Sequence, residues 1–251
     1  MLINRSVWSA SSVFPSGQEW ADDTERILGF LEAQGVLDAF LPRLLVREWE
    51  GAFAEARVGY FFKRNGFKIL NWEPMEVPDR PGDIDIQWMD TEPIFVEVKG
   101  PGWEGELAAE VRNDRKLLPK YINGEARVLD TTGPLVKAID KAIPKFAAAR
   151  ANVVAIADDL FMSPLELPLD FLEAKIERHL SKAECVCVGG VLFLYPVKVV
   201  DRPLEYRHYF ISNSAASRPL PDTVVQGLTA GNWHDRSHET EHNPAQDPDL
   251  A

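Results

Sequence analysis

Acidic and basic side chains recur at strand spacing in residues 81–100, PGDIDIQWMDTEPIFVEVKG. Asp83 and Asp85 lie in one short apolar run, and Glu97 and Lys99 lie in the next. Because side chains alternate between the faces of a strand, the two aspartates share one face of the first run, and the glutamate and the lysine share one face of the second. Carboxylates about 4 Å apart at a partly dry surface repel by roughly 4 kcal/mol, and a divalent cation bound by their oxygens removes this repulsion most directly.

The same pattern has a simpler interpretation, in which two edge strands carry solvated charges, because polar and apolar residues alternate in any half-buried strand. Glu55 favours a site. In a helix it shares a face with Ala52, Gly59 and Phe62, which are small or apolar. Small residues on this helix would allow it to lie close to a sheet, bringing Glu55 toward the carboxylates.

These segments resemble the PD-(D/E)XK nuclease superfamily. Asp85, Glu97 and Lys99 fall on its three signature positions, and residues 51–70, with Glu55, are similar to its first helix and strand. The resemblance implies an α/β, restriction-endonuclease-like fold, in which a mixed central sheet is flanked by helices. An N-terminal helical extension and a C-terminal strand-rich decoration would complete it.

The resemblance also implies a phosphodiesterase that cleaves DNA with Mg2+ or Mn2+. Asp85 and Glu97 would hold the metal, together with the Val98 carbonyl and water. Lys99 would orient or deprotonate the attacking water, or offset developing charge. Glu55 would hold a second metal or a metal-bound water.

The choice of aspartate is a narrower question. Asp85 lies between Ile84 and Ile86, well inside the strand, and matches family members that read acid-apolar-Asp-apolar, so we expect it to be the ligand. Asp83, two residues after Pro81, is the alternate ligand, directly or through a water. A second alternative is that Asp83 only begins the strand and binds no metal.

Charge is unevenly distributed along the chain, whose formal net charge is -12. This balance argues against nonspecific coating of nucleic acid, which depends on Lys and Arg neutralising phosphates, but it does not exclude a nuclease. Residues 111–150 hold nine basic residues against four acidic ones, a local excess of five positive charges. From this segment we expect nucleic-acid contacts by Arg112, Arg115, Lys116, Lys120, Lys137 and Lys141. An ordinary solvated helix face is the alternative for the lysines.

The chain is expected to be cytoplasmic and to make no membrane contact, because no apolar N-terminal region or bilayer-length run is visible. Cys185 and Cys187 are expected to remain reduced on one strand. Besides DNA, a homodimer or a protein partner is possible. A catalytically silent, nuclease-like binding module is the second interpretation of function, supported by the acidic balance.

Four regions are expected along the chain. They are residues 1–46, an N-terminal helical extension; 47–160, the nuclease-like core; 161–231, a helix and strands completing the same domain; and 232–251, a flexible polar tail. In the tail His234, His238 and His242 recur every fourth residue, but nothing around them supports a stable helix that could hold a metal.

Both strands and helices are expected along the chain. Three antiparallel strands cover about 67–72, 83–89 and 94–99; a helix begins near 132; a strand buried on both faces covers 151–157; and a helix covers 169–182. A hairpin of 184–188 and 191–195, turning at Gly189-Gly190, and a strand at 206–211 follow.

Overall fold

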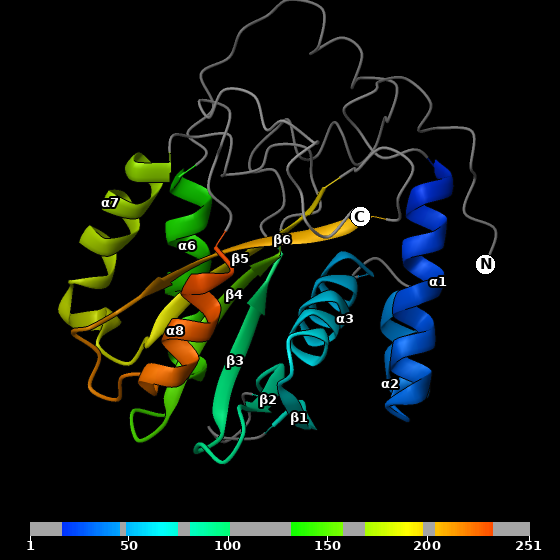
Figure 1. The fold of residues 1–251 in the computed structure, drawn as a ribbon, viewed down its shortest axis with the longest axis horizontal. Coiled ribbons are helices and arrows are strands. Elements are labelled where there is room, and N and C mark those ends of the chain that lie inside the picture. Colours follow the sequence, from blue (N-terminus) through cyan, green and yellow to red (C-terminus); the bar gives the residue numbers. More distant parts are fainter. Residues whose placement is uncertain are drawn as a thin grey trace, which may run out of the picture.

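The computed structural model describes residues 17–45, 49–74, 81–100, 132–157, 169–197 and 204–232. They form a mixed α/β fold, in which a six-stranded sheet is flanked by helices (Figure 1). The expected fold class is therefore confirmed. No helix among the described ranges is both long and apolar enough to cross a bilayer.

The strands lie side by side in the order in which the chain forms them. They are β1 (Lys68–Trp72), β2 (Ile84–Gln87), β3 (Ile94–Lys99), β4 (Ala151–Ala157), β5 (Gly190–Val197) and β6 (Glu205–Ser212). β1, β2 and β3 pair antiparallel, as the sequence predicts, whereas β3, β4 and β5 are parallel and β6 returns antiparallel to β5. The central strands β3 and β4 are buried along almost their whole length, which explains why most of their residues are apolar and leaves Glu97 and Asn152 as buried polar side chains.

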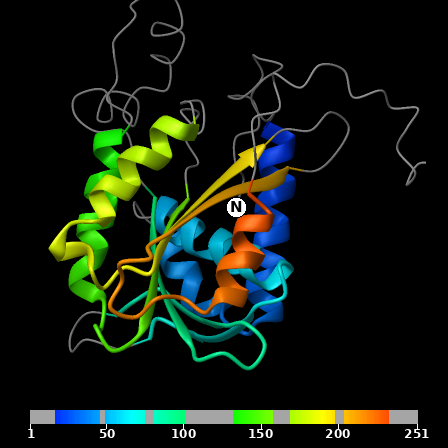
Figure 2. The ribbon, with the colours of Figure 1, turned by 60° about the vertical axis from the view of Figure 1, so that its left-hand side comes forward.

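Helices cover both faces of the sheet (Figure 2). One face carries α6 (Thr132–Ala142) and α7 (Leu169–Leu180), which lie in the described parts of the two parallel crossovers. Both crossovers place their helix on the same face, as expected when they have the same hand. The other face carries α3 (Trp49–Arg64) and α8 (Asp222–Ala230), while α1 (Gly17–Ala33) and α2 (Leu37–Leu44) pack against α3.

Strand alternation divides the core between these two layers. On β3, Phe95 packs with the residues of α6 and α7, whereas Val96 and Val98 pack with those of α3 and α8. On β4, Val154 packs in the layer of α6 and α7, and Val153 packs in the layer of α3 and α8. Since Glu97 is two residues from Phe95, its side chain lies on the α6 face of the sheet.

The predicted hairpin at Gly189-Gly190 is wrong. Residues 183–185 form a short 3-10 helix, η5 (Ala183–Cys185), and β5 begins only at Gly190. The alternating apolar side chains reflect a packed turn, in which Cys185 and Val188 are buried and the Gly189 N–H donates to the Asn152 carbonyl at 2.7 Å. Periodicity alone does not distinguish such a turn from a short strand.

Asn232 is more than the first residue of a polar tail. Its side-chain oxygen accepts from the Phe210 N–H at 2.6 Å, and its side-chain nitrogen donates to the Phe210 carbonyl at 3.0 Å. It therefore satisfies both backbone groups of one residue of β6, the last strand of the described sheet. The other residues expected in the tail, including the three histidines, lie outside the described ranges.

Replacing Asn232 with alanine is expected to lower the free energy of unfolding by about 1–2 kcal/mol, because the two Phe210 backbone groups lose their partner. Urea unfolding followed by tryptophan fluorescence measures the change. A chain that ends at Asn232 is the control and should unfold like the parent. Equal unfolding midpoints for parent and Asn232→Ala would contradict this role.

Candidate functional site

Buried carboxylates meet where β2 begins and β3 ends. The register sets Ile84 opposite Val96, so the next positions along the pair, Asp83 and Glu97, lie opposite each other on the same face. Glu97 is fully buried, Asp83 is 8% exposed, and Glu55 of α3 is 7% exposed. Buried charges require partners, and the site is defined by the partners that these three have.

Asp83 is fixed by the backbone of β3. Its Oδ2 accepts a hydrogen bond from the Val98 N–H at 2.6 Å. The preceding residue, Gly82, lies against the ring of Phe95, where any Cβ would overlap the ring. A glycine is therefore required for the chain to approach this closely and to deliver the Asp83 carboxylate beside Glu97.

Two lysines share one oxygen of Glu97. Lys99 from the end of β3 pairs with Oε1, and Lys145 from η3 (Ile143–Lys145) lies 2.6 Å from the same atom. The Lys145 ammonium is also 3.9 Å from Asp83 Oδ1. The second oxygen of Glu97, Oε2, is buried and has no hydrogen-bond partner among the described residues. An unpaired buried carboxylate oxygen is costly, and a cation or a donor at Oε2 would offset that cost.

Glu55 approaches the cluster from the α3 side. Both of its oxygens are bound by the guanidinium of Arg43 on α2, with 2.7 Å between Nη1 and Oε2. Arg43 also reaches Glu73 at 3.1 Å. The helix lies close to the end of β3, since a Cβ on Gly100 would be in van der Waals contact with Ala54. Glu55 is thus held at the end of the strand that carries Glu97 and Lys99.

The electrostatics are dominated by burial. The pKa of Asp83 is raised to about 7, chiefly by desolvation and then by the neighbouring charges of Glu55 and Glu97. Lys145 opposes this rise but is outweighed. Desolvation also raises the pKa of Glu55, although Arg43 lowers it. Ionisation of Asp83 and of Glu55 is therefore disfavoured in the folded protein.

The other candidate aspartate has a different environment. Asp85 Oδ1 accepts from Arg150 at 2.8 Å, and its Oδ2 is 3.4 Å from the side-chain amide of Asn71. Asp85 lies opposite Phe95, two pairs away from the Asp83 and Glu97 pair. The structure therefore groups Glu55, Glu97 and Lys99 with Asp83, and it pairs Asp85 with an arginine.

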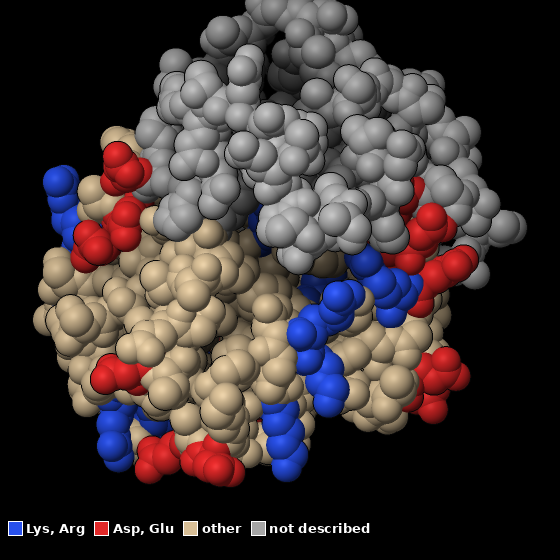
Figure 3. Space-filling model, viewed as in Figure 1, with Lys and Arg blue, Asp and Glu red and all other residues tan. Residues whose placement is uncertain are grey.

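The expected nucleic-acid contacts are described only in part. Lys137 and Lys141 are exposed on α6. The four expected contacts Arg112, Arg115, Lys116 and Lys120 lie outside the described ranges. On the face drawn in Figure 3, acidic and basic side chains both lie on the described surface, so that face has no uniform charge.

Lys145 and Arg43 are two further residues of the site that the sequence pattern does not indicate. Lys145 continues the four-residue repeat of Lys137 and Lys141, and only the Pro144 after the end of α6 signals that its direction changes. Arg43 had no local signal, because its partner is twelve residues away in another helix.

Comparison with known proteins finds no matching family model and no matching curated protein. A solved structure, that of Pyrococcus furiosus SfsA in complex with Ca2+, matches at 16% sequence identity with a TM-score of 0.28. The match covers 66% of this chain and 64% of that chain, which is less than two thirds of its length.

Proposed function

We propose that this protein is a metal-dependent phosphodiesterase of the PD-(D/E)XK type that cleaves DNA. The observation that carries the proposal is the buried, unpaired Oε2 of Glu97 beside Asp83, with Lys99 on the same strand. A divalent cation would give that oxygen a partner, and hard carboxylate oxygens suit Mg2+ or Mn2+.

Asp83 and Glu97 would hold the cation in this proposal. The sequence favours Asp85 as the first ligand, but its bond to Arg150 supports moving that role to Asp83. The Val98 carbonyl and Glu55 keep their proposed roles, the former as a further ligand and the latter on the α3 side of the cation. When bound, the cation would acidify a water and stabilise charge on the phosphate.

The two lysines would position the attacking water and stabilise charge at the site. Lys99 is half of an ion pair at Glu97, so its ammonium is oriented by a residue that would also bind the cation. It would hold the attacking water or offset the charge that develops on the phosphate. Lys145 bridges Asp83 and Glu97, which keeps the two carboxylates together in the absence of a cation.

DNA is the proposed substrate. The local excess of basic residues after β3 supports a polyanionic ligand, and the exposed Lys137 and Lys141 would contact its phosphates. The overall negative charge supports localised contacts at this segment rather than binding over the whole surface.

A second candidate function rests on a specific observation. Three cationic side chains, Arg43, Lys99 and Lys145, already face three carboxylates in the cluster. Such internal balance also suits a catalytically silent module that binds a partner through its surface.

Incubation with supercoiled plasmid, linear duplex and single-stranded DNA separates the two functions. The nuclease should cleave at least one of these substrates with Mg2+ or Mn2+, and EDTA should stop it, because charge stabilisation at the phosphate is lost. Gel electrophoresis detects the products. If neither metal supports cleavage of any of the three, the silent module is the better assignment.

A further inference from the structure

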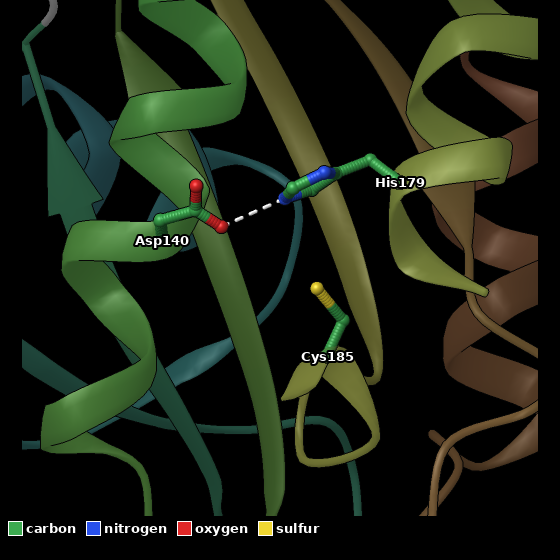
Figure 4. Close-up of side chains that lie close together, drawn as sticks. All are labelled: Asp140, His179 and Cys185. Atoms are coloured by element: carbon green, nitrogen blue, oxygen red, sulfur yellow. Dashed lines mark hydrogen bonds and ion pairs between the residues drawn. The ribbon is translucent and has the colours of Figure 1, made fainter. Parts of the chain in front are cut away.

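Three different metal-ligating side chains meet on the α6 face of the sheet, apart from the carboxylate cluster. Asp140 comes from α6, His179 from the last turn of α7, and Cys185 from η5. Their donor atoms all lie within 4.8 Å of one another. Figure 4 shows the imidazole between the α6 and α7 ribbons, with the thiol pointing toward the same space.

The geometry is close to what a metal ion needs. The His179 Nε2 is 2.8 Å from Asp140 Oδ1. Zinc is bound at about 2.3 Å by thiolate sulfur and at about 2.0–2.2 Å by imidazole nitrogen and carboxylate oxygen, so the donors of a tetrahedral site lie roughly 3.3–3.8 Å from one another. Small rotations of the three side chains would therefore bring them into position.

Burial favours a site with one accessible edge. Cys185 is fully buried and His179 is 5% exposed, whereas the side chain of Asp140 is 49% exposed. The cysteine and histidine would form the inner wall, and a cation could enter past Asp140. Three protein ligands leave a fourth position for water.

An ion pair between Asp140 and His179 would by itself link α6 to α7. Cys185 packs in the core on this face of the sheet, and its sulfur also lies within 4.8 Å of both other donor atoms, which the ion pair alone does not require. Burial, together with the charges of Asp140 and Glu184, raises the pKa of Cys185 to about 11. Metal binding would release the proton of the Cys185 thiol into solvent, because cysteine coordinates as the thiolate.

We propose that Asp140, His179 and Cys185 bind a single Zn2+ at a site that is independent of the proposed nuclease centre. Thiolate and imidazole ligands favour zinc and similar late transition metals, whereas Mg2+ is bound best by carboxylates and water. The ion would fasten α6, α7 and η5 to one another. The proposal does not depend on DNA cleavage.

Cobalt titration of the untagged, reduced, full-length protein tests the site, because Co2+ bound to thiolate absorbs in the near ultraviolet by charge transfer from sulfur. The chain has only two cysteines, so the absorption can come only from Cys185 or Cys187. Cys185→Ser should abolish it. The matched control, Cys187→Ser, should retain it, since Cys187 is not among the three converging donors.

Supporting results are saturation at one Co2+ per chain and displacement by one Zn2+. His179→Gln and Asp140→Asn should each weaken Co2+ binding by roughly tenfold or more. Glu97→Gln should leave the absorption unchanged, which separates this site from the carboxylate cluster. If the parent shows no sulfur absorption with Co2+, or if the absorption depends on Cys187 instead, the proposal is overturned even where a Cys185 variant does not fold.

Discussion

Replacing Lys99 with alanine is expected to lower metal-dependent DNA cleavage by at least roughly a hundredfold, because removal of one preorganised charge at the reacting group typically costs about 3 kcal/mol. The loss should appear in kcat at saturating Mn2+. The ammonium of Lys99 is held at Glu97 before any substrate binds, so its position needs no rearrangement during the reaction.

The control is Lys63→Ala, which removes an exposed lysine near the end of α3 and should leave the rate unchanged. The aspartates provide a second comparison. Asp83→Asn should be as damaging as Lys99→Ala, whereas Asp85→Asn should retain most of the rate. A Lys99→Ala protein that cleaves as fast as the parent would remove the catalytic role from this cluster.

The metal-free protein is expected to lose stability as the pH rises from about 4 to about 8, and Asp83→Asn should remove most of that dependence. The pKa of Asp83 is raised by burial from its ordinary value near 4 to about 7. The folded chain therefore keeps a proton that the unfolded chain releases, so the stability contributed by this group is complete below pH 4 and is lost through pH 7. A tenfold change in acidity corresponds to about 1.4 kcal/mol, so the effect could reach about 4 kcal/mol, and less where Glu55 titrates with it.

Urea unfolding in EDTA across this pH range measures the effect. Asp90→Asn, at an exposed turn, should keep the slope of the parent. Adding Mn2+ at pH 8 should restore stability to the parent but not to Asp83→Asn, because binding to the folded state stabilises it by mass action. A parent whose stability is flat between pH 4 and pH 8 would show that the Asp83 carboxyl ionises without cost.

The sheet and most helices could be predicted from sequence, because local periodicity carries them. Residues 151–157 are apolar except for Asn152, and the strand they form is covered on both faces. The segment with Cys185 and Val188 also alternates, but its place in a buried turn depends on Asn152, more than thirty residues earlier. Such distant partners leave no local signal.

The site also combines features that local sequence predicts with features that depend on distant partners. The face shared by Glu97 and Lys99 follows from alternation alone. The choice between Asp83 and Asp85 depends on strand register, and a shift of two residues along β2 keeps the face while exchanging the partner of Glu97. Arg150 and Lys145 reach the aspartates from a segment about sixty residues further on, so only the folded chain shows which aspartate each one pairs with.

The agreement between spatial strand order and chain order also bears on how the molecule is assembled. Every strand in the described sheet has its preceding strand as a neighbour, so a chain emerging from the ribosome can add each new strand to an edge that already exists. The carboxylate pair on β2 and β3 would come together early, in a hairpin that closes over few residues. Lys145 is synthesised later, just before β4, so the two acids would meet before this partner is available.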